Sequence, residues 1–216
     1  MHYYLSMSLK QVLKPTGTTR ERLVQAALRT LKERGFHGAT ARNIAAAAGL
    51  NQALVFYHFG SVRQLLLEAL EATSLQRLVR YRAGLEGVST VAQLVEAMAA
   101  LYQEDVQSGH ITAVQEMVAG ASFEPELRRQ VVARMEPWIA FAEEVLARVV
   151  GGTVLEAFLP VHDLAFAAVA FYVGIETVTH LDGNRRRADA LFGAGRQLAD
   201  VADAVLRSTT WTGERS

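Results

Sequence analysis

The sequence of 216 residues predicts an all-α protein. Apolar residues recur at helical spacing along most of the chain, and no stretch alternates with period two for long enough to indicate a sheet. Proline is scarce, with four residues in all, while capping residues and glycines punctuate the periodic stretches. These observations favour a small N-terminal group of short helices followed by a larger helical domain.

The N-terminal elements are short and clearly bounded. Residues 1–17 are expected to form a flexible arm. Thr40 precedes a helix that ends at Gly49, because hydroxyl side chains cap helix N-termini and glycine suits the C-terminal stop. The predicted helices run from Thr18 or Thr19 to Gly35, then over 41–48 and 51–59, and onward from a cap at Ser61.

The remainder of the chain is also predicted to be helical. Residues 84–89 should break the pattern. Pro125 suits the first turn of a helix, and Pro137 is expected to kink or divide the helix in which it lies. The predicted helices cover 90–107, 110–120, 125–150, 161–182 and 185–207, with a tail at 209–216. We therefore expect one domain at 18–62 and a second at 63–208.

Composition narrows the possible classes of protein. The absence of cysteine excludes disulfides and thiolate metal sites and fits a cytoplasmic protein. No signal peptide is predicted, and the apolar run from Leu164 to Ile175 is shorter than the roughly 20 residues of a membrane span. No nucleophile motif, phosphate loop or metal-binding His spacing is present, so we expect no enzyme, no metal, no other cofactor and no membrane partner.

The net charge of zero conceals an uneven distribution. Through Gly60 the chain carries eight basic residues against two acidic ones, whereas the rest carries 14 basic against 20 acidic. A basic N-terminal quarter on an acidic body favours a polyanion partner for one end only. A solvated basic face would give the same composition, so the charge alone does not decide between the two.

The segment from Thr40 to Phe59 reads TARNIAAAAGLNQALVFYHF and predicts two short helices joined by a sharp turn. Small side chains on the first helix allow the second to approach closely, and Gly49 can adopt the left-handed conformation that the turn requires. Helices of two turns need tertiary packing to form. This is the helix-turn-helix pattern, whose second helix enters the DNA major groove by its N-terminal residues.

The stretch from Arg20 to Leu70 resembles the tetracycline-repressor-like (TetR) family of regulators. The resemblance rests on ordered positions at fixed spacing: Gly35-Phe36, Gly38, Thr40, Ile44-Ala45, Ala48-Gly49, Tyr57-His58-Phe59 and Leu65-Leu66. It covers about a quarter of the chain. It implies an all-α dimer with an N-terminal three-helix helix-turn-helix domain and a larger C-terminal helical domain for ligand binding and dimerisation.

Individual residues suggest how DNA would be contacted. Gln52 and Ala53 begin the second helix, where glutamine can pair with adenine and alanine can touch a thymine methyl group. Thr40 and Arg42 stand at the N-terminus of the preceding helix, where backbone N–H groups favour a phosphate, and the resemblance implies the same role. The predicted DNA-binding set is Thr40, Arg42, Asn51, Gln52, Ala53, Tyr57, His58 and Arg63.

Two positions depart from the family pattern. Family members usually carry a tyrosine at the place of Phe56 and a lysine at the place of Val62, and both contact phosphate in relatives. Tyr57, Arg63 or the basic arm could compensate for the missing polar groups. We expect Phe56 and Phe59 to lie in the core.

The C-terminal domain carries weaker signals. Polar and aromatic side chains on otherwise apolar helices are candidates to line an effector pocket: Tyr102, His110, Glu116, Trp138, Phe141, Tyr172 and Glu176. The resemblance implies that the last two long helices form the dimer interface. The stripes that would serve are Ala165, Ala168, Val169 and Tyr172 on one helix, and Leu191, Ala194, Leu198, Val201 and Val205 on the other.

The sequence therefore predicts a ligand-responsive transcriptional regulator. The simplest form is a repressor that a small apolar effector releases from a near-palindromic operator. Its partners would be double-stranded DNA, a second copy of the chain and an unidentified effector. Two alternatives remain: a helical adaptor that no longer reads DNA, and a carrier for a small molecule.

Overall fold

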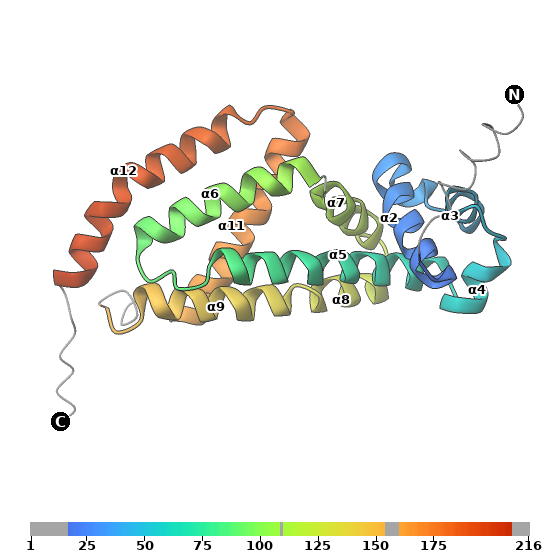
Figure 1. Ribbon diagram of the computed structural model, residues 1–216, viewed down its shortest axis with the longest axis horizontal. Coiled ribbons are helices and arrows are strands. Elements are labelled where there is room, and N and C mark those ends of the chain that lie inside the picture. Colours follow the sequence, from blue (N-terminus) through green and yellow to red (C-terminus); the bar gives the residue numbers. More distant parts are fainter. Residues whose placement is uncertain (1–16, 109, 154–159, 209–216) are drawn as a thin grey trace, which may run out of the picture. The chain divides into compact units, whose positions relative to one another are not determined.

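The structure is a computed structural model that describes residues 17–108, 110–153 and 160–208 (Figure 1). Every regular element in these ranges is a helix, which confirms the all-α prediction. Apart from Gly17, the predicted arm at 1–17 lies outside the described residues, as does the tail at 209–216. The chain forms two compact units, one extending to Leu70 and the other beginning at Glu71.

The first unit contains helices α2 (Thr19–Gly38), α3 (Ala41–Ala48) and α4 (Ala53–Phe59), and the first part of α5 (Val62–Gly84). The boundary between the units falls inside α5, so the same helix contributes to both. Apolar side chains on one face of α2 and of α5 point inward. The buried side chains of this unit include Leu23, Ala26, Ala27, Leu31, Ile44, Val55, Leu65, Leu66, Ala69 and Leu70.

The predicted capping residues fix the helix boundaries in this unit. Thr18 forms a capping box with Glu21 at the start of α2. Gly35 interrupts that helix at φ 70° and ψ 178°, as its predicted role as a stop requires. Thr40 caps α3, and the Ser61 hydroxyl accepts from the Gln64 N–H at 3.1 Å at the start of α5.

The second unit contains the rest of α5 and six further helices. These are α6 (Val91–Ser108), α7 (His110–Ala121), α8 (Pro125–Ala133), α9 (Glu136–Val150), α11 (Val161–Asp182) and α12 (Arg186–Ser208). Pro125 lies in the first turn of α8, and Pro137 lies at the start of α9, where it divides the predicted long helix.

Two helix pairs form the frame of the second unit. Helix α11 packs on α9, and α12 packs on α6, which Figure 1 shows running side by side. Tyr81, Leu101, Phe141, Val145 and Leu206 belong to its apolar core. This core joins α5, α6 and α9 to the C-terminal end of α12, so it ties residues far apart in the sequence into one unit.

Helix α11 is long and apolar enough to cross a membrane by length and composition alone, yet little of it is buried in the protomer. Its inner side carries the buried Glu176, and the exposed side carries Phe166, Phe171, Val178 and Leu181. In the single chain, this helix therefore leaves most of its apolar surface exposed. An apolar helix with one face uncovered is the kind of surface that a partner covers.

Asp203 on α12 caps α6 from outside that helix. Its Oδ1 accepts from the Val91 N–H at 2.7 Å, and its Oδ2 accepts from the Ala92 N–H at 3.0 Å. We expect Asp203→Ala to lower the free energy of unfolding by about 1–2 kcal/mol, because two N-terminal N–H groups lose their acceptor. Urea unfolding measures this change. The exposed Asp200 is the control, and an equal loss in Asp200→Ala would contradict the capping account.

Candidate DNA-binding surface and effector site

The N-terminus of α3 presents polar groups to solvent. The Thr40 hydroxyl accepts from the Asn43 N–H at 3.2 Å, and the Asn43 amide donates to the Gly38 carbonyl at 2.9 Å. These bonds hold the chain ahead of α3 in place. Thr40 is exposed, and so is Arg42 in the first turn of the helix. Both predicted phosphate-contacting residues therefore stand at one accessible helix end.

The turn after α3 has the geometry that the sequence predicts. Gly49 adopts the left-handed conformation at φ 64° and ψ 38°, which a residue with a Cβ rarely takes. The Leu50 N–H donates to the Ala45 carbonyl at 2.9 Å and closes the end of the helix. A sharp, hydrogen-bonded turn fixes the direction of α4 relative to α3.

Arginine side chains of α2 reinforce the same turn. Arg22 donates to the Ala48 carbonyl at 2.8 Å, and Arg29 donates to the Ala47 carbonyl at 3.2 Å. Arg20 pairs with Glu68 and lies 5.0 Å from the centre of the Phe59 ring. Part of the basic excess near the N-terminus therefore holds the unit together rather than facing a polyanion.

The start of α4 is exposed to solvent. The Asn51 side chain accepts from the Ala53 N–H at 2.9 Å, so it caps α4 from one residue before Gln52. Gln52 and Ala53 are both exposed. Val55 and Phe59 face inward, so α4 packs by one stripe and leaves the other side accessible.

Phe56 is not a core residue, and that prediction is wrong. Its side chain is 52% exposed, whereas Phe59 is buried. The reason is helical geometry: Phe56 lies one residue after the buried Val55, which turns it about 100° away from the inner stripe. Tyr57 beside it is 81% exposed, and its ring contacts that of His58 at 4.9 Å. Arg63 is exposed in the first turn of α5.

The second unit holds a buried cluster of charged and aromatic side chains, which we name the Arg77 cluster. Arg77 on α5 donates to both carboxylate oxygens of Asp105 on α6. Its guanidinium also lies 3.5 Å from Glu176 on α11. The aromatic members are Tyr81 on α5, Trp138 on α9 and Tyr172 on α11, which donates to Asp105 at 3.1 Å.

Aromatic rings surround the guanidinium and extend the cluster. The Arg77 guanidinium carbon lies 5.2 Å from the centre of the Trp138 ring and 5.5 Å from that of Tyr81. The Tyr172 ring lies 6.2 Å from the ring of Tyr102, whose hydroxyl donates to Thr179 at 3.1 Å. The cluster thus connects α5, α6, α9 and α11 by contacts between buried polar groups.

The electrostatics of the two carboxylates differ. Burial opposes ionisation of Asp105, but the Arg77 charge and the bonds from Arg77, Tyr81 and Tyr172 hold its pKa below the ordinary value. Burial raises the pKa of Glu176 to about 7, because the attraction of Arg77 offsets burial and the repulsion of Asp105 only in part. Asp105 is therefore ionised at neutral pH, while Glu176 is poised to gain or lose a proton.

The pH dependence of folding stability tests this state of Glu176. Folding shifts its pKa from 4.5 to about 7, so the stability that its proton supplies is complete below pH 4.5 and lost as pH rises through 7. We expect Glu176→Gln to match the wild type near pH 4.5 and exceed it by on the order of 3 kcal/mol above pH 8. Urea unfolding at both pH values measures this, and a difference independent of pH would contradict it.

The structure places the predicted pocket residues as follows. Tyr102, Trp138, Tyr172 and Glu176 meet in or beside the Arg77 cluster, whereas Phe141 belongs to the apolar core. Glu116 is half-buried on α7, and the side chain of His110 lies outside the described part of the structure. The centre of the cluster consists of residues that the sequence did not single out: Arg77, Tyr81 and Asp105.

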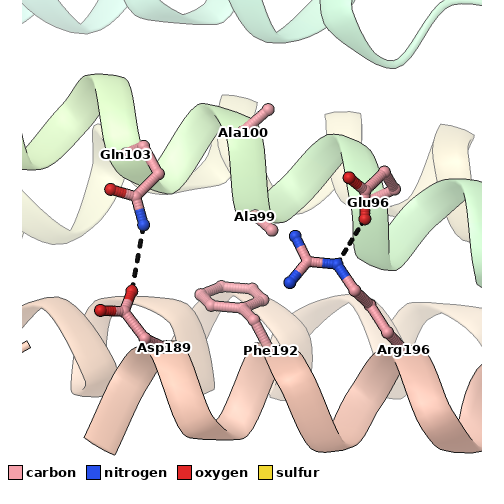
Figure 2. Close-up of a pocket in the computed structure, with 7 residues that line it drawn as sticks. All are labelled: Glu96, Ala99, Ala100, Gln103, Asp189, Phe192 and Arg196. Atoms are coloured by element: carbon pink, nitrogen blue, oxygen red, sulfur yellow. Dashed lines mark hydrogen bonds and ion pairs between the residues drawn. The ribbon is translucent and has the colours of Figure 1, made fainter. Parts of the chain in front are cut away.

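A separate hollow opens between α6 and α12 (Figure 2). It has a volume of about 380 Å³, and the aromatic ring of Phe192 lies between its two polar ends. Its lining residues are Glu96, Ala99, Ala100, Gln103, Asp189, Phe192 and Arg196. None of the predicted pocket residues lines it. Figure 2 shows Arg196 paired with Glu96 at one end and Asp189 joined to Gln103 at the other.

The predicted dimer-interface stripe is exposed on α12 but partly buried on α11. Leu191, Leu198, Val201 and Val205 on α12 are exposed, as is Ala194. On α11, Ala168 is exposed and Val169 half-buried, but Ala165 is fully buried and the Tyr172 hydroxyl bonds inward. Ala165 and Tyr172 are therefore corrected to the inner face. Helix α11 is apolar all round, so spacing alone cannot tell its two faces apart.

The first unit has a helix-turn-helix DNA-binding fold. Its two short helices, α3 and α4, pack together across a left-handed glycine turn, and α4 is accessible to solvent. Residues 23–69 match the sequence model of the bacterial regulatory proteins of the tetR family. Over these residues, the first unit of the chain is similar to the proteins of this family.

Curated relatives match part of the chain. The chain is 31% identical over 87 residues to the HTH-type transcriptional regulator UidR of Escherichia coli, which is 40% of this chain and 44% of UidR. It is 45% identical over 53 residues to the HTH-type transcriptional regulator BetI of Agrobacterium fabrum, or 24% of this chain and 26% of BetI. The matches thus span less than half of these relatives.

Solved structures share the fold over most of the chain. The fatty acid degradation regulator FadR of Bacillus halodurans superposes with a TM-score of 0.69 at 16% identity, over 86% of this chain and 96% of its own. FadR of Bacillus subtilis, in complex with stearoyl-CoA, superposes with a TM-score of 0.64 at 15% identity, over 83% of this chain and 96% of its own. A protein from Saccharomonospora viridis, in complex with choline, superposes with a TM-score of 0.63 at 20% identity, over 84% of this chain and 95% of its own. These likenesses confirm the predicted fold, a helix-turn-helix domain followed by a helical domain.

Proposed function

We propose that the protein is a ligand-responsive DNA-binding transcriptional regulator. The observation that carries this proposal is the accessible start of α4, with Gln52 and Ala53 exposed beside the exposed N-cap of α3 at Thr40. A glutamine at an exposed helix N-terminus can bond to base edges in the major groove. The N-terminus of α3 can bind a phosphate of the DNA backbone. Regulation of transcription, rather than catalysis, is also the role named for the curated relatives.

A dimer fits the exposed apolar surface of α11 and α12. Leu198 is 66% exposed and Leu181 78%, and a soluble protein covers such a surface with a partner. A two-fold dimer would present two copies of α4 to DNA, so its operator would be a near-palindrome with half-sites about 34–36 Å apart or a multiple of that distance.

Helix α5 offers a path by which an effector would act on DNA binding. It begins directly after α4, crosses the boundary between the units and carries Arg77 and Tyr81 into the buried cluster. An effector that binds the second unit better in one position of α5 than in another would shift the population of dimers. We propose a repressor that such an effector releases from its operator. Structural neighbours in complex with stearoyl-CoA and with choline support a ligand role for this domain.

Two substitutions on the DNA side separate base reading from phosphate contact. We expect Gln52→Ala to relax base preference at one position per half-site, at a cost of about 1–3 kcal/mol for the preferred operator. We expect Arg42→Ala to lower the affinity for all DNA sequences alike and to reduce the salt dependence of binding.

Fluorescence anisotropy with the operator and point-mutated duplexes measures both effects. The exposed Glu33 on α2 provides the control variant Glu33→Gln. Unchanged affinity and base preference in both Gln52→Ala and Arg42→Ala would contradict the proposed contacts.

A further inference from the structure

The Arg77 cluster carries more buried negative charge than positive charge. Asp105 is 1% exposed, Glu176 4% and Arg77 7%, so one guanidinium faces two carboxyl groups. Asp105 takes most of the compensation, because it accepts two bonds from Arg77 and one each from Tyr81 and Tyr172. Glu176 receives only the distant Arg77 contact at 3.5 Å among the described interactions. A buried carboxylate with so little compensation is costly unless a cation approaches it.

The surroundings of Glu176 already accommodate a cation. The guanidinium of Arg77 lies against the rings of Trp138 and Tyr81, at 5.2 Å and 5.5 Å from their centres. Aromatic faces attract cations, and their attraction is strongest where water is excluded. The chain's own arginine therefore occupies a setting of aromatic rings and carboxylates that suits organic cations in general.

A series of ring contacts joins the hollow between α6 and α12 to this setting. The Phe192 ring, which lines the hollow, lies 5.3 Å from the ring of Tyr102, and the Tyr102 ring lies 6.2 Å from that of Tyr172. The hollow repeats the charge balance of the cluster, with Glu96 and Asp189 against Arg196. Its small residue Ala99 lies opposite the Phe192 ring, where an alkyl group would meet no bulky side chain from α6 (Figure 2).

We infer that the effector is an organic cation of the alkylammonium class, whose charged group pairs with Glu176 among the aromatic rings and whose alkyl part extends past Tyr102 toward the hollow. This inference rests on the proposed function, because it names the effector of the same domain. An anionic effector would add a third negative group beside one guanidinium. A neutral one would gain no attraction from the ionised form of Glu176.

Displacement of Arg77 links such an effector to DNA binding. Arg77 belongs to α5, the helix that follows α4, and its present partners lie on α6 and α11. A cation that pairs with Glu176 competes with Arg77 for this carboxylate. It therefore weakens the contact between Arg77 and Glu176, which joins α5 to α11. The effector would thus favour a different position of α5 in the dimer.

Three probes of equal chain length test the charge requirement: hexyltrimethylammonium, 1-hexanol and hexanoate. Isothermal titration calorimetry of the full chain at pH 8 should show the cation binding at least tenfold more tightly than the alcohol, with hexanoate weakest. Glu176→Gln should remove the preference for the cation, and the exposed control Glu86→Gln should retain it. Tightest binding of hexanoate, equal binding of cation and alcohol, or an unchanged preference in Glu176→Gln would overturn the inference.

A second measurement needs only the wild-type chain. At pH 6.5 the cation should release a fraction of a proton on binding, because Glu176 must ionise beside Arg77, Asp105, Tyr81 and Tyr172. Titrations in buffers of different ionisation enthalpy measure that release, and its absence would overturn the inference. The proposed function fails separately, through a lack of operator selection measured without any of these compounds.

Discussion

Asp105→Ala is expected to lower the free energy of unfolding by about 3–5 kcal/mol. Asp105 is almost fully buried and is the acceptor that balances the buried Arg77. Among the described residues, its removal leaves the guanidinium with the distant Glu176 as its carboxylate partner. It also removes the acceptor that the Tyr81 and Tyr172 hydroxyls share. Urea unfolding followed by circular dichroism measures this loss.

The double variant Arg77→Met with Asp105→Leu is the control for this prediction. Replacement of a buried ion pair by apolar residues of similar volume costs far less than removal of one partner, because no unpaired charge is left behind. Glu176 can then remain protonated. We expect the double variant to recover most of the stability lost in Asp105→Ala. An equal loss in both variants would show that volume, rather than charge, governs this site.

Leu198→Asp is expected to weaken operator binding at least a hundredfold while leaving the protomer folded. The side chain is 66% exposed in the single chain, so the substitution costs the protomer little. In the proposed dimer it lies at the middle of the α12 stripe, where a carboxylate would be buried without a partner. Loss of the dimer removes the second half-site contact, which is worth several orders of magnitude in affinity. Analytical ultracentrifugation and anisotropy with the operator measure both effects.

The exposed Asp200, two residues after Leu198, provides the comparison for this experiment. Asp200→Ala lies on the same helix and alters charge without touching the apolar stripe. We expect it to dimerise and bind DNA like the wild type. A Leu198→Asp protein that remains a dimer with full affinity would place the interface on another surface.

Local sequence signals predicted the N-terminal unit well because local chemistry determines it. Thr40 caps α3, Gly49 adopts the required left-handed turn and Ser61 caps α5, each through bonds within a few residues. The failure at Phe56 has a local cause too. An aromatic residue suggested core, but its place one residue after Val55 turns it outward.

The centre of the second unit depended on contacts between residues far apart in sequence. Asp105 is 28 residues from Arg77, and Glu176 is 99 residues from it. One signal was present: Arg77 and Tyr81 continue the inward stripe of α5 that contains Leu70 and leads to Leu85. A charged residue on such a stripe indicates a buried partner, although spacing cannot say which acid supplies it. The sequence also could not distinguish the buried face of α11 from the exposed one, because both faces are apolar.

Selection of bound sequences from a random duplex pool, with the purified full chain near physiological salt, tests the central proposal most directly. A dimeric operator reader should enrich a near-palindrome whose half-sites are spaced by whole turns of DNA, with affinity that falls steeply as salt rises. Recovery of unrelated sequences, without enrichment over successive rounds and lost as salt rises, would contradict operator reading. The chain would then carry a helix-turn-helix fold that no longer reads DNA, as an adaptor would.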